Sequence, residues 1–78
     1  MKLCEAIAQR VKDLLNERKL KQYYLFKKGG ISRSTISSLL KLEIKNVSTD
    51  LVYQICATLE ISLKDFFDDP LFDNLDDW

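Results

Sequence analysis

Residues 29–39 of the chain read GGISRSTISSL and separate two predicted helices. The glycine pair ends the first helix, because glycine readily adopts the left-handed conformation of a helix C-cap. Ser32 begins the second helix, since its hydroxyl can accept a hydrogen bond from a backbone N–H of the first turn. Ile31 and Ile36 have the spacing of a hydrophobic staple around that cap. The stretch therefore predicts a short helix from about Ser32 to Lys41.

This short helix has two chemically different faces. Its apolar positions are Ile36, Leu39 and Leu40, which share one side at helical spacing. The other side carries small hydroxyls and cations: Arg33, Ser34, Ser37, Ser38 and Lys41. Serine is only a middling helix former, so this face is not optimised for helix stability. Small hydroxyls allow close approach and cations favour an anionic partner, which suits a helix in the major groove of DNA. The alternative is an ordinary solvated face.

The composition predicts one small all-α domain. The chain has 78 residues, of which 46% are hydrophobic and 31% charged, with only two glycines and one proline. So few turn-forming residues favour helices joined by short turns over a fold of many strands. No run approaches the roughly 20 apolar residues of a membrane span, and the first five residues are too polar for a secretion signal. We expect a cytoplasmic protein that does not contact membranes.

No pattern in the sequence predicts catalysis or a cofactor. Cys4 and Cys56 are the two cysteines, and the chain has no histidine to complete a zinc site. In a reducing cytosol we expect both thiols to be small buried apolar groups. The chain also lacks a glycine-rich phosphate loop and a recognisable nucleophile–base pair. We therefore predict a protein that is not an enzyme, with no cofactor, no metal and no evident small-molecule effector.

The zero net charge hides an uneven distribution. Residues 1–64 hold all 12 Lys and Arg and six acidic residues, a net charge of +6. Residues 65–78 hold the other six acidic residues and no base, a net charge of −6. A basic body favours a polyanionic partner. Alternatively, the two parts attract each other within one fold.

Four further helices follow from periodicity and capping residues. Leu3, Ile7, Val11 and Leu14 predict a first helix of about four turns that ends near Glu17. The second runs from Lys21 or Gln22 to Lys28, with no capping side chain at its start. Its core position is Leu25, with Phe26 or Tyr23 beside it. Ser48 begins the fourth helix and Ser62 the fifth, in which Phe66 or Phe67 should close the core.

The last ten residues carry an apolar edge. Asp69 is a suitable cap and Pro70 a suitable first residue for a short terminal helix. Leu71, Leu75 and Trp78 would share one side of it, with Phe72 adjacent. This edge is a candidate dimer surface. The alternative is that it folds back on the core of its own chain.

Residues 22–41 resemble the helix-turn-helix of the lambda-repressor/Cro-like (XRE-type) transcriptional regulators. The likeness covers Ile7 to Phe67, and its ordered elements are Arg10-Val11-Lys12, Gln22, Gly30, Ile31 to Ser37, Lys45-Asn46 and Leu59 to Phe67. It implies a five-helix DNA-binding domain over residues 1–67, followed by an acidic, aromatic extension over residues 68–78. Its expected partner is the double-stranded DNA of an operator. Because one small module contacts few base pairs, we also expect a homodimer on a two-fold-symmetric site.

The resemblance also implies roles for individual residues. The third helix would lie in the major groove with its first residues at the base edges. The expected base contacts are Arg33, Ser34, Ser37 and Ser38. The expected phosphate contacts are Gln22, Lys21, Lys41 and Lys45, which position the protein without reading sequence. Such a protein would regulate transcription, most simply as a repressor.

Three positions depart from the family pattern. Phe26 stands where a small residue is common, so it must tilt the helices or turn outward. Leu40 stands where a glutamate often pairs with an arginine at the Arg10 position, so Arg10 must find Glu43, another acid or water. Leu42 replaces a frequent glycine.

A protein-binding module on the same fold, such as an antitoxin-like or anti-repressor adaptor, is the alternative function. The aromatic residues that could form its docking patch are Tyr23, Tyr24, Phe26, Phe72 and Trp78.

Overall fold

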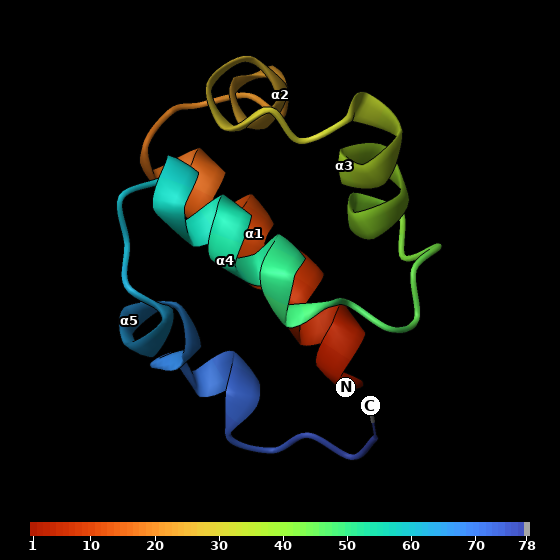
Figure 1. Cartoon of the computed structure of the whole chain (residues 1–78). Coiled ribbons are helices and arrows are strands. Elements are labelled where there is room, and N and C mark those ends of the chain that lie inside the picture. The colour runs from red at the N-terminus through yellow and green to blue at the C-terminus, as the bar shows by residue number, and fades with distance from the viewer. Residues whose placement is uncertain (78) are drawn as a thin grey trace.

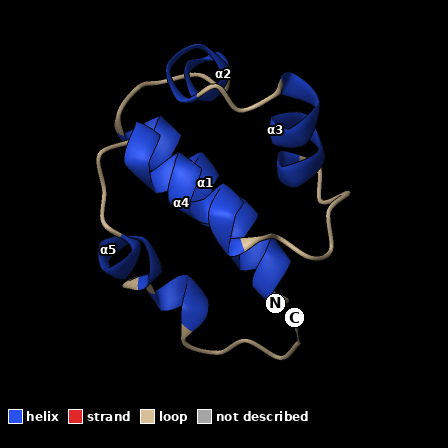
Figure 2. Ribbon diagram, viewed as in Figure 1, coloured by secondary structure: helices blue, strands red, loops and turns tan. Residues whose placement is uncertain are grey.

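The structure is a computed structural model that describes residues 1–77, and it consists of helices joined by short loops (Figures 1 and 2). In chain order the elements are α1 (Leu3–Glu17), α2 (Tyr23–Gly29), α3 (Arg33–Leu40), α4 (Thr49–Thr58), α5 (Leu63–Phe67) and the single-turn 3-10 helix η1 (Pro70–Phe72). Within the described residues the only β-type pairing is an isolated bridge between Lys2 and Asp77. The predicted five-helix all-α fold is confirmed. Across residues 1–77, no helix has the length and apolar character needed to cross a membrane.

Serine hydroxyls begin three of the five α-helices, as predicted. The side chain of Ser32 accepts a hydrogen bond from the Thr35 N–H at 3.2 Å. Ser48 and Ser62 do the same for α4 and α5, each at 3.0 Å. The residue before α2 is Gln22, whose side chain makes no capping bond. Packing must therefore hold α2 in place.

The two glycines after α2 have different functions. Gly30 adopts a left-handed conformation with φ of 68°, and its N–H donates to the Phe26 carbonyl at 3.1 Å. Gly29 is still helical and lies against Thr58 of α4, whose Cβ would be 3.2 Å from a Cβ at position 29. One glycine thus allows the turn, and the other allows α2 to approach α4.

The core is formed by apolar side chains from all five α-helices. In Figure 1, α1 and α4 cross the middle of the molecule, with α2 and α3 at one end and α5 and η1 at the other. The least exposed large side chains are Val11, Leu25, Leu39, Ile55 and Phe66. Phe66 is the ring that closes the core, with 0% exposure, whereas Phe67 is 40% exposed. Cys4 and Cys56 are both buried free thiols, and burial raises the pKa of Cys56.

Arg10 is buried and ties the C-terminal part of the chain to α1. Its Nε donates to the Phe66 carbonyl at 2.7 Å, and its Nη2 donates to the Asp65 carbonyl at 2.8 Å. Its Nη1 forms an ion pair with Asp69 at 3.2 Å. Asp69, not Glu43, therefore pairs with Arg10 in place of the glutamate that is absent at position 40.

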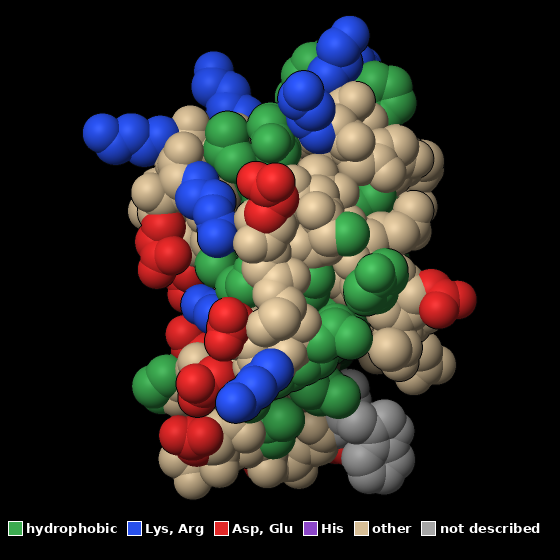
Figure 3. Space-filling model, turned by 60° about the vertical axis from the view of Figure 1, so that its left-hand side comes forward, with side chains coloured by type: hydrophobic (Ala, Val, Ile, Leu, Met, Phe, Trp, Pro, Cys, Tyr) green, Lys and Arg blue, Asp and Glu red, His purple; other side chains and the backbone are tan. Residues whose placement is uncertain are grey.

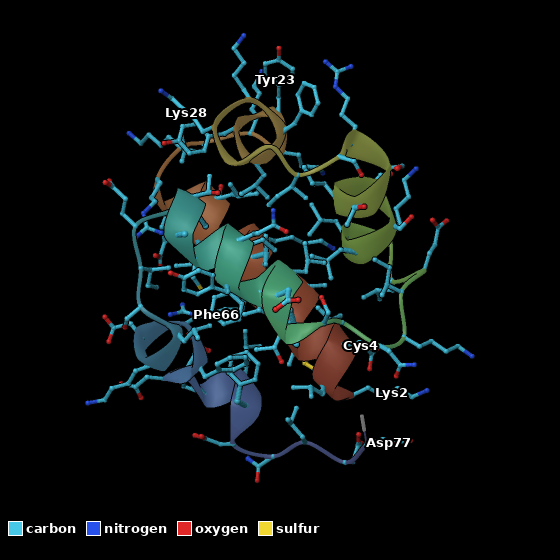
Figure 4. The ribbon with its side chains drawn as sticks, viewed as in Figure 1. Lys2, Cys4, Tyr23, Lys28, Phe66 and Asp77 are labelled. Atoms are coloured by element: carbon cyan, nitrogen blue, oxygen red, sulfur yellow. The ribbon has the colours of Figure 1, made fainter. Side chains whose placement is uncertain are left out.

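The C-terminal extension forms less helix than the sequence predicted. Asp69 caps it and Pro70 begins it as expected, but the helix ends after one turn at Phe72. The chain then returns to α1, where the Leu3 N–H donates to the Asp77 carbonyl at 2.9 Å and the Asp76 N–H donates to the Met1 carbonyl at 3.2 Å. These backbone bonds are incompatible with a continuing helix. Figure 4 shows Lys2 and Asp77 at this junction.

Candidate DNA interface

The candidate DNA interface is formed by α2, α3 and the turn between them. The turn consists of Gly30, Ile31 and Ser32. Ile31 and Ile36 are buried on either side of the Ser32 cap, and Leu39 and Leu40 bury the rest of the same side of α3. This packing fixes the rotation of α3 about its axis. The polar side of α3 is therefore directed away from the core.

The four predicted base-contacting residues begin at the first residue of α3. Arg33 and Ser34 are exposed, whereas Ser37 and Ser38 are half-buried. The Ser34 hydroxyl lies 3.4 Å from that of Ser32. The N-terminal turn of α3 thus presents a cation and a small hydroxyl to solvent.

The predicted phosphate-contacting residues do not gather at this turn: two precede α2, and two follow α3. Lys21 and Gln22 lie at the start of α2, Lys41 directly follows α3, and Lys45 lies in the loop before α4. All four side chains are exposed. Lys27 and Lys28 near the end of α2 are also exposed, although the sequence analysis assigned them no contact. Asp69 and Asp76 form ion pairs with Arg10 and with the N-terminal amine, and not with these side chains.

Two aromatic rings lie against Arg33. The centre of its guanidinium is 4.7 Å from the Phe26 ring centroid and 5.1 Å from the Tyr23 ring centroid. Phe26 has turned outward and is 36% exposed, and Tyr23 is 50% exposed. Neither ring is therefore the buried neighbour of Leu25 that the sequence suggested, and it is Tyr24 that packs against the core. Their spacing of three residues, which places them on one face of a helix, is the signal that could have paired them.

The acidic end of the chain lies away from the first turn of α3. Figure 1 shows the chain returning to the start of α1, at the opposite end of the molecule from α2. The charges separate in the same way in Figure 3, where Lys and Arg gather over α2 and most Asp and Glu lie lower on the molecule. The acidic end therefore does not cover the exposed Arg33 and Ser34 at the start of α3, although Asp77 lines a hollow with Leu42 and Lys45 in the loop after α3.

The candidate dimer edge packs partly on its own chain. Leu71, Phe72 and Leu75 are half-buried. The Phe72 ring centroid is 5.0 Å from that of Phe67 and 6.1 Å from that of Phe66. Trp78 lies outside the described residues.

Comparison with protein families matches residues 10–70 to the Cro/C1-type helix-turn-helix DNA-binding domain. The chain belongs to this family. The matched region begins at Arg10 and extends past Asp69, the two residues that form the buried ion pair. Membership confirms the predicted relationship to Cro-like regulators, and with it a DNA-binding domain as the class of this Cro/C1-type protein.

The fold is also similar to that of a phage-derived protein. The crystal structure of the prophage Lp1 protein 11 has 25% sequence identity to this Cro/C1-type chain and a TM-score of 0.83. The alignment covers 96% of this chain and 100% of that one. No curated protein sequence matches the chain.

Proposed function

We propose that this Cro/C1-type protein is a small transcriptional regulator, most simply a repressor, that binds a specific double-stranded DNA sequence with α3 in the major groove. The observation that carries the proposal is the polar side of α3. It begins at an exposed arginine, is fixed in rotation by buried Ile31 and Ile36, and is not covered by the acidic end of the chain. In helix-turn-helix proteins the N-terminal residues of the second helix of the motif contact base edges.

The proposed DNA contacts are of two kinds: base contacts that read the sequence, and phosphate contacts that position the protein. Arg33 is the leading base reader, since a guanidinium can donate two parallel hydrogen bonds to guanine O6 and N7. Ser34, Ser37 and Ser38 are the further proposed base contacts. The proposed phosphate contacts are exposed residues before α2 and after α3 that would fix the register of the protein on the duplex: Gln22, Lys21, Lys41 and Lys45.

The test of this function is selection of binding sites from random duplexes, followed by a salt titration on the selected site. We expect one enriched sequence and an affinity that falls steeply with salt. Three lysine–phosphate contacts per protomer correspond to a slope of log K against log salt of about −3 for one protomer and about −5 for a dimer. A chain that enriches no duplex, even at low ionic strength, would exclude DNA reading and favour the protein-binding alternative.

We further propose that the protein binds its operator as a homodimer, because one module of this size contacts few base pairs. The proposed dimer surface consists of Leu71, Phe72 and Leu75, which are partly exposed, together with Trp78. Leu75→Asp should shift the protein toward monomer in analytical ultracentrifugation while its circular dichroism spectrum stays unchanged. A variant that remains dimeric would remove this edge from the interface.

A further inference from the structure

We infer that Tyr23 and Phe26 are positioning residues for Arg33, whose guanidinium they hold at the start of α3 for base reading. The inference rests on the proposed DNA-binding function and adds two residues to it. Neither aromatic residue is placed at the DNA by the family resemblance, and Phe26 is a departure from the family pattern.

The geometry is that of a cation resting on a pair of rings. The guanidinium lies within 5.1 Å of both ring centroids, and the two rings are 5.7 Å apart with an interplanar angle of 45°. A cation within about 6 Å of a ring centroid is attracted by the negative face of the ring. Figure 4 shows Tyr23 at the end of the molecule where α2 faces the start of α3. The same side chains, with Gln22, Ile36 and Ser37, line a hollow between the two helices.

Stacking and base reading use different parts of the guanidinium. A ring contacts the flat face of the group, whereas its five N–H donors lie in the plane and point outward. Arg33 can therefore keep both aromatic contacts while it donates two hydrogen bonds to a guanine. A free arginine side chain loses rotamer freedom on binding, and a group already held in place loses less.

The two rings are the principal contacts that restrain the Arg33 side chain. No carboxylate among residues 1–77 forms an ion pair with it. Burial alone does not account for Phe26, because Leu25 fills the core position of α2 with 0% exposure while Phe26 remains 36% exposed. The outward-facing Phe26 ring has the guanidinium of Arg33 as its neighbour.

The test is a double-mutant cycle on the selected duplex and on an unrelated duplex. Phe26→Ala and Phe26→Leu should each weaken binding to the selected site about three- to fivefold, because a less restrained Arg33 side chain loses more rotamer freedom on binding. Phe26→Tyr keeps a ring and should bind as the wild type does. In an Arg33→Ala background, Phe26→Ala should change the affinity little. Tyr53→Ala removes a more exposed aromatic residue from α4 and should leave binding unchanged.

An NMR measurement on the free protein complements the double-mutant cycle. The side-chain protons of Arg33 should show upfield ring-current shifts in NMR spectra, and these shifts should shrink in Phe26→Leu. The inference is overturned if Phe26→Leu binds like the wild type, if the effects of Phe26→Ala and Arg33→Ala simply add, or if loss of the ring tightens binding. A wild-type chain that selects no duplex overturns the proposed function as well, whereas additive effects on a selected duplex overturn only this inference.

Discussion

At the scale of single residues, the two ends of α3 have different proposed functions. Arg33 is exposed at the first residue of the helix, whereas Lys41 directly follows its last residue. The proposed roles differ accordingly: Arg33 reads a base, and Lys41 neutralises a phosphate. The two roles predict different dependence on DNA sequence.

Arg33→Ala should cost about 1–3 kcal/mol of specific binding free energy and relax the preference at one base position. Lys41→Ala should instead weaken binding to all duplexes alike and lower the salt slope by about one. Fluorescence anisotropy against a panel of single-base variants of the selected site measures both effects. Indistinguishable profiles for the two variants across the panel would refute the division of roles.

Contacts between residues that are close in sequence could be predicted. The outward orientation of the Tyr23 and Phe26 rings could not. The hydroxyls of Ser32, Ser48 and Ser62 each bond a backbone N–H three residues away, so local sequence is sufficient to place them. The choice of Phe66 over Phe67 as the buried ring depends on packing by several helices. The contact of Tyr23 and Phe26 with Arg33 depends on how α2 and α3 meet, which periodicity does not specify.

At the scale of elements, the position of α2 depends on its contact with α4. Gly29 lies against Thr58, which leaves no room for a side chain at position 29. The Thr58 hydroxyl donates to the Gln54 carbonyl at 2.7 Å, so its rotamer is held in place. Because α2 bears the two rings and directly follows the proposed phosphate contacts Lys21 and Gln22, its distance from α4 affects the proposed DNA interface.

Gly29→Ala should lower the free energy of unfolding by about 1–3 kcal/mol, the range expected for overpacking. Thr58→Ala makes space at the same point, so the Gly29→Ala/Thr58→Ala double variant should recover most of that loss. Urea unfolding followed by circular dichroism measures the cycle. Costs that simply add in the double variant would show that this contact does not limit the approach of the helices.

At the scale of the whole molecule, the acidic end packs beside α1 and leaves α3 exposed. Arg10 joins α1 to Phe66 and Asp69, and the backbone of residues 76 and 77 pairs with residues 1 and 3. The sequence predicted the charge separation and the cap at Asp69. It left open whether the extension folds back, and it did not specify the pairing with residues 1 and 3, because that pairing joins residues more than 70 positions apart.

Arg10→Met keeps most of the side-chain volume and removes three hydrogen bonds. It should lower the free energy of unfolding by about 2–4 kcal/mol, because the Phe66 and Asp65 carbonyls and the Asp69 carboxylate lose their donor. Lys12→Met, on an exposed position of the same helix, is the matched control and should change stability little. Thermal unfolding measures the stability of both variants. Equal stability of Arg10→Met and Lys12→Met would show that Arg10 does not anchor the C-terminal part of the chain.

The most direct measurement is an NMR titration of the isotope-labelled protein with its selected duplex. The account predicts the largest chemical-shift changes at the start of α2, at Arg33 and along the polar side of α3, with little change at Leu3 or over residues 73–77. Shifts concentrated on the C-terminal residues, with α3 unaffected, would contradict it.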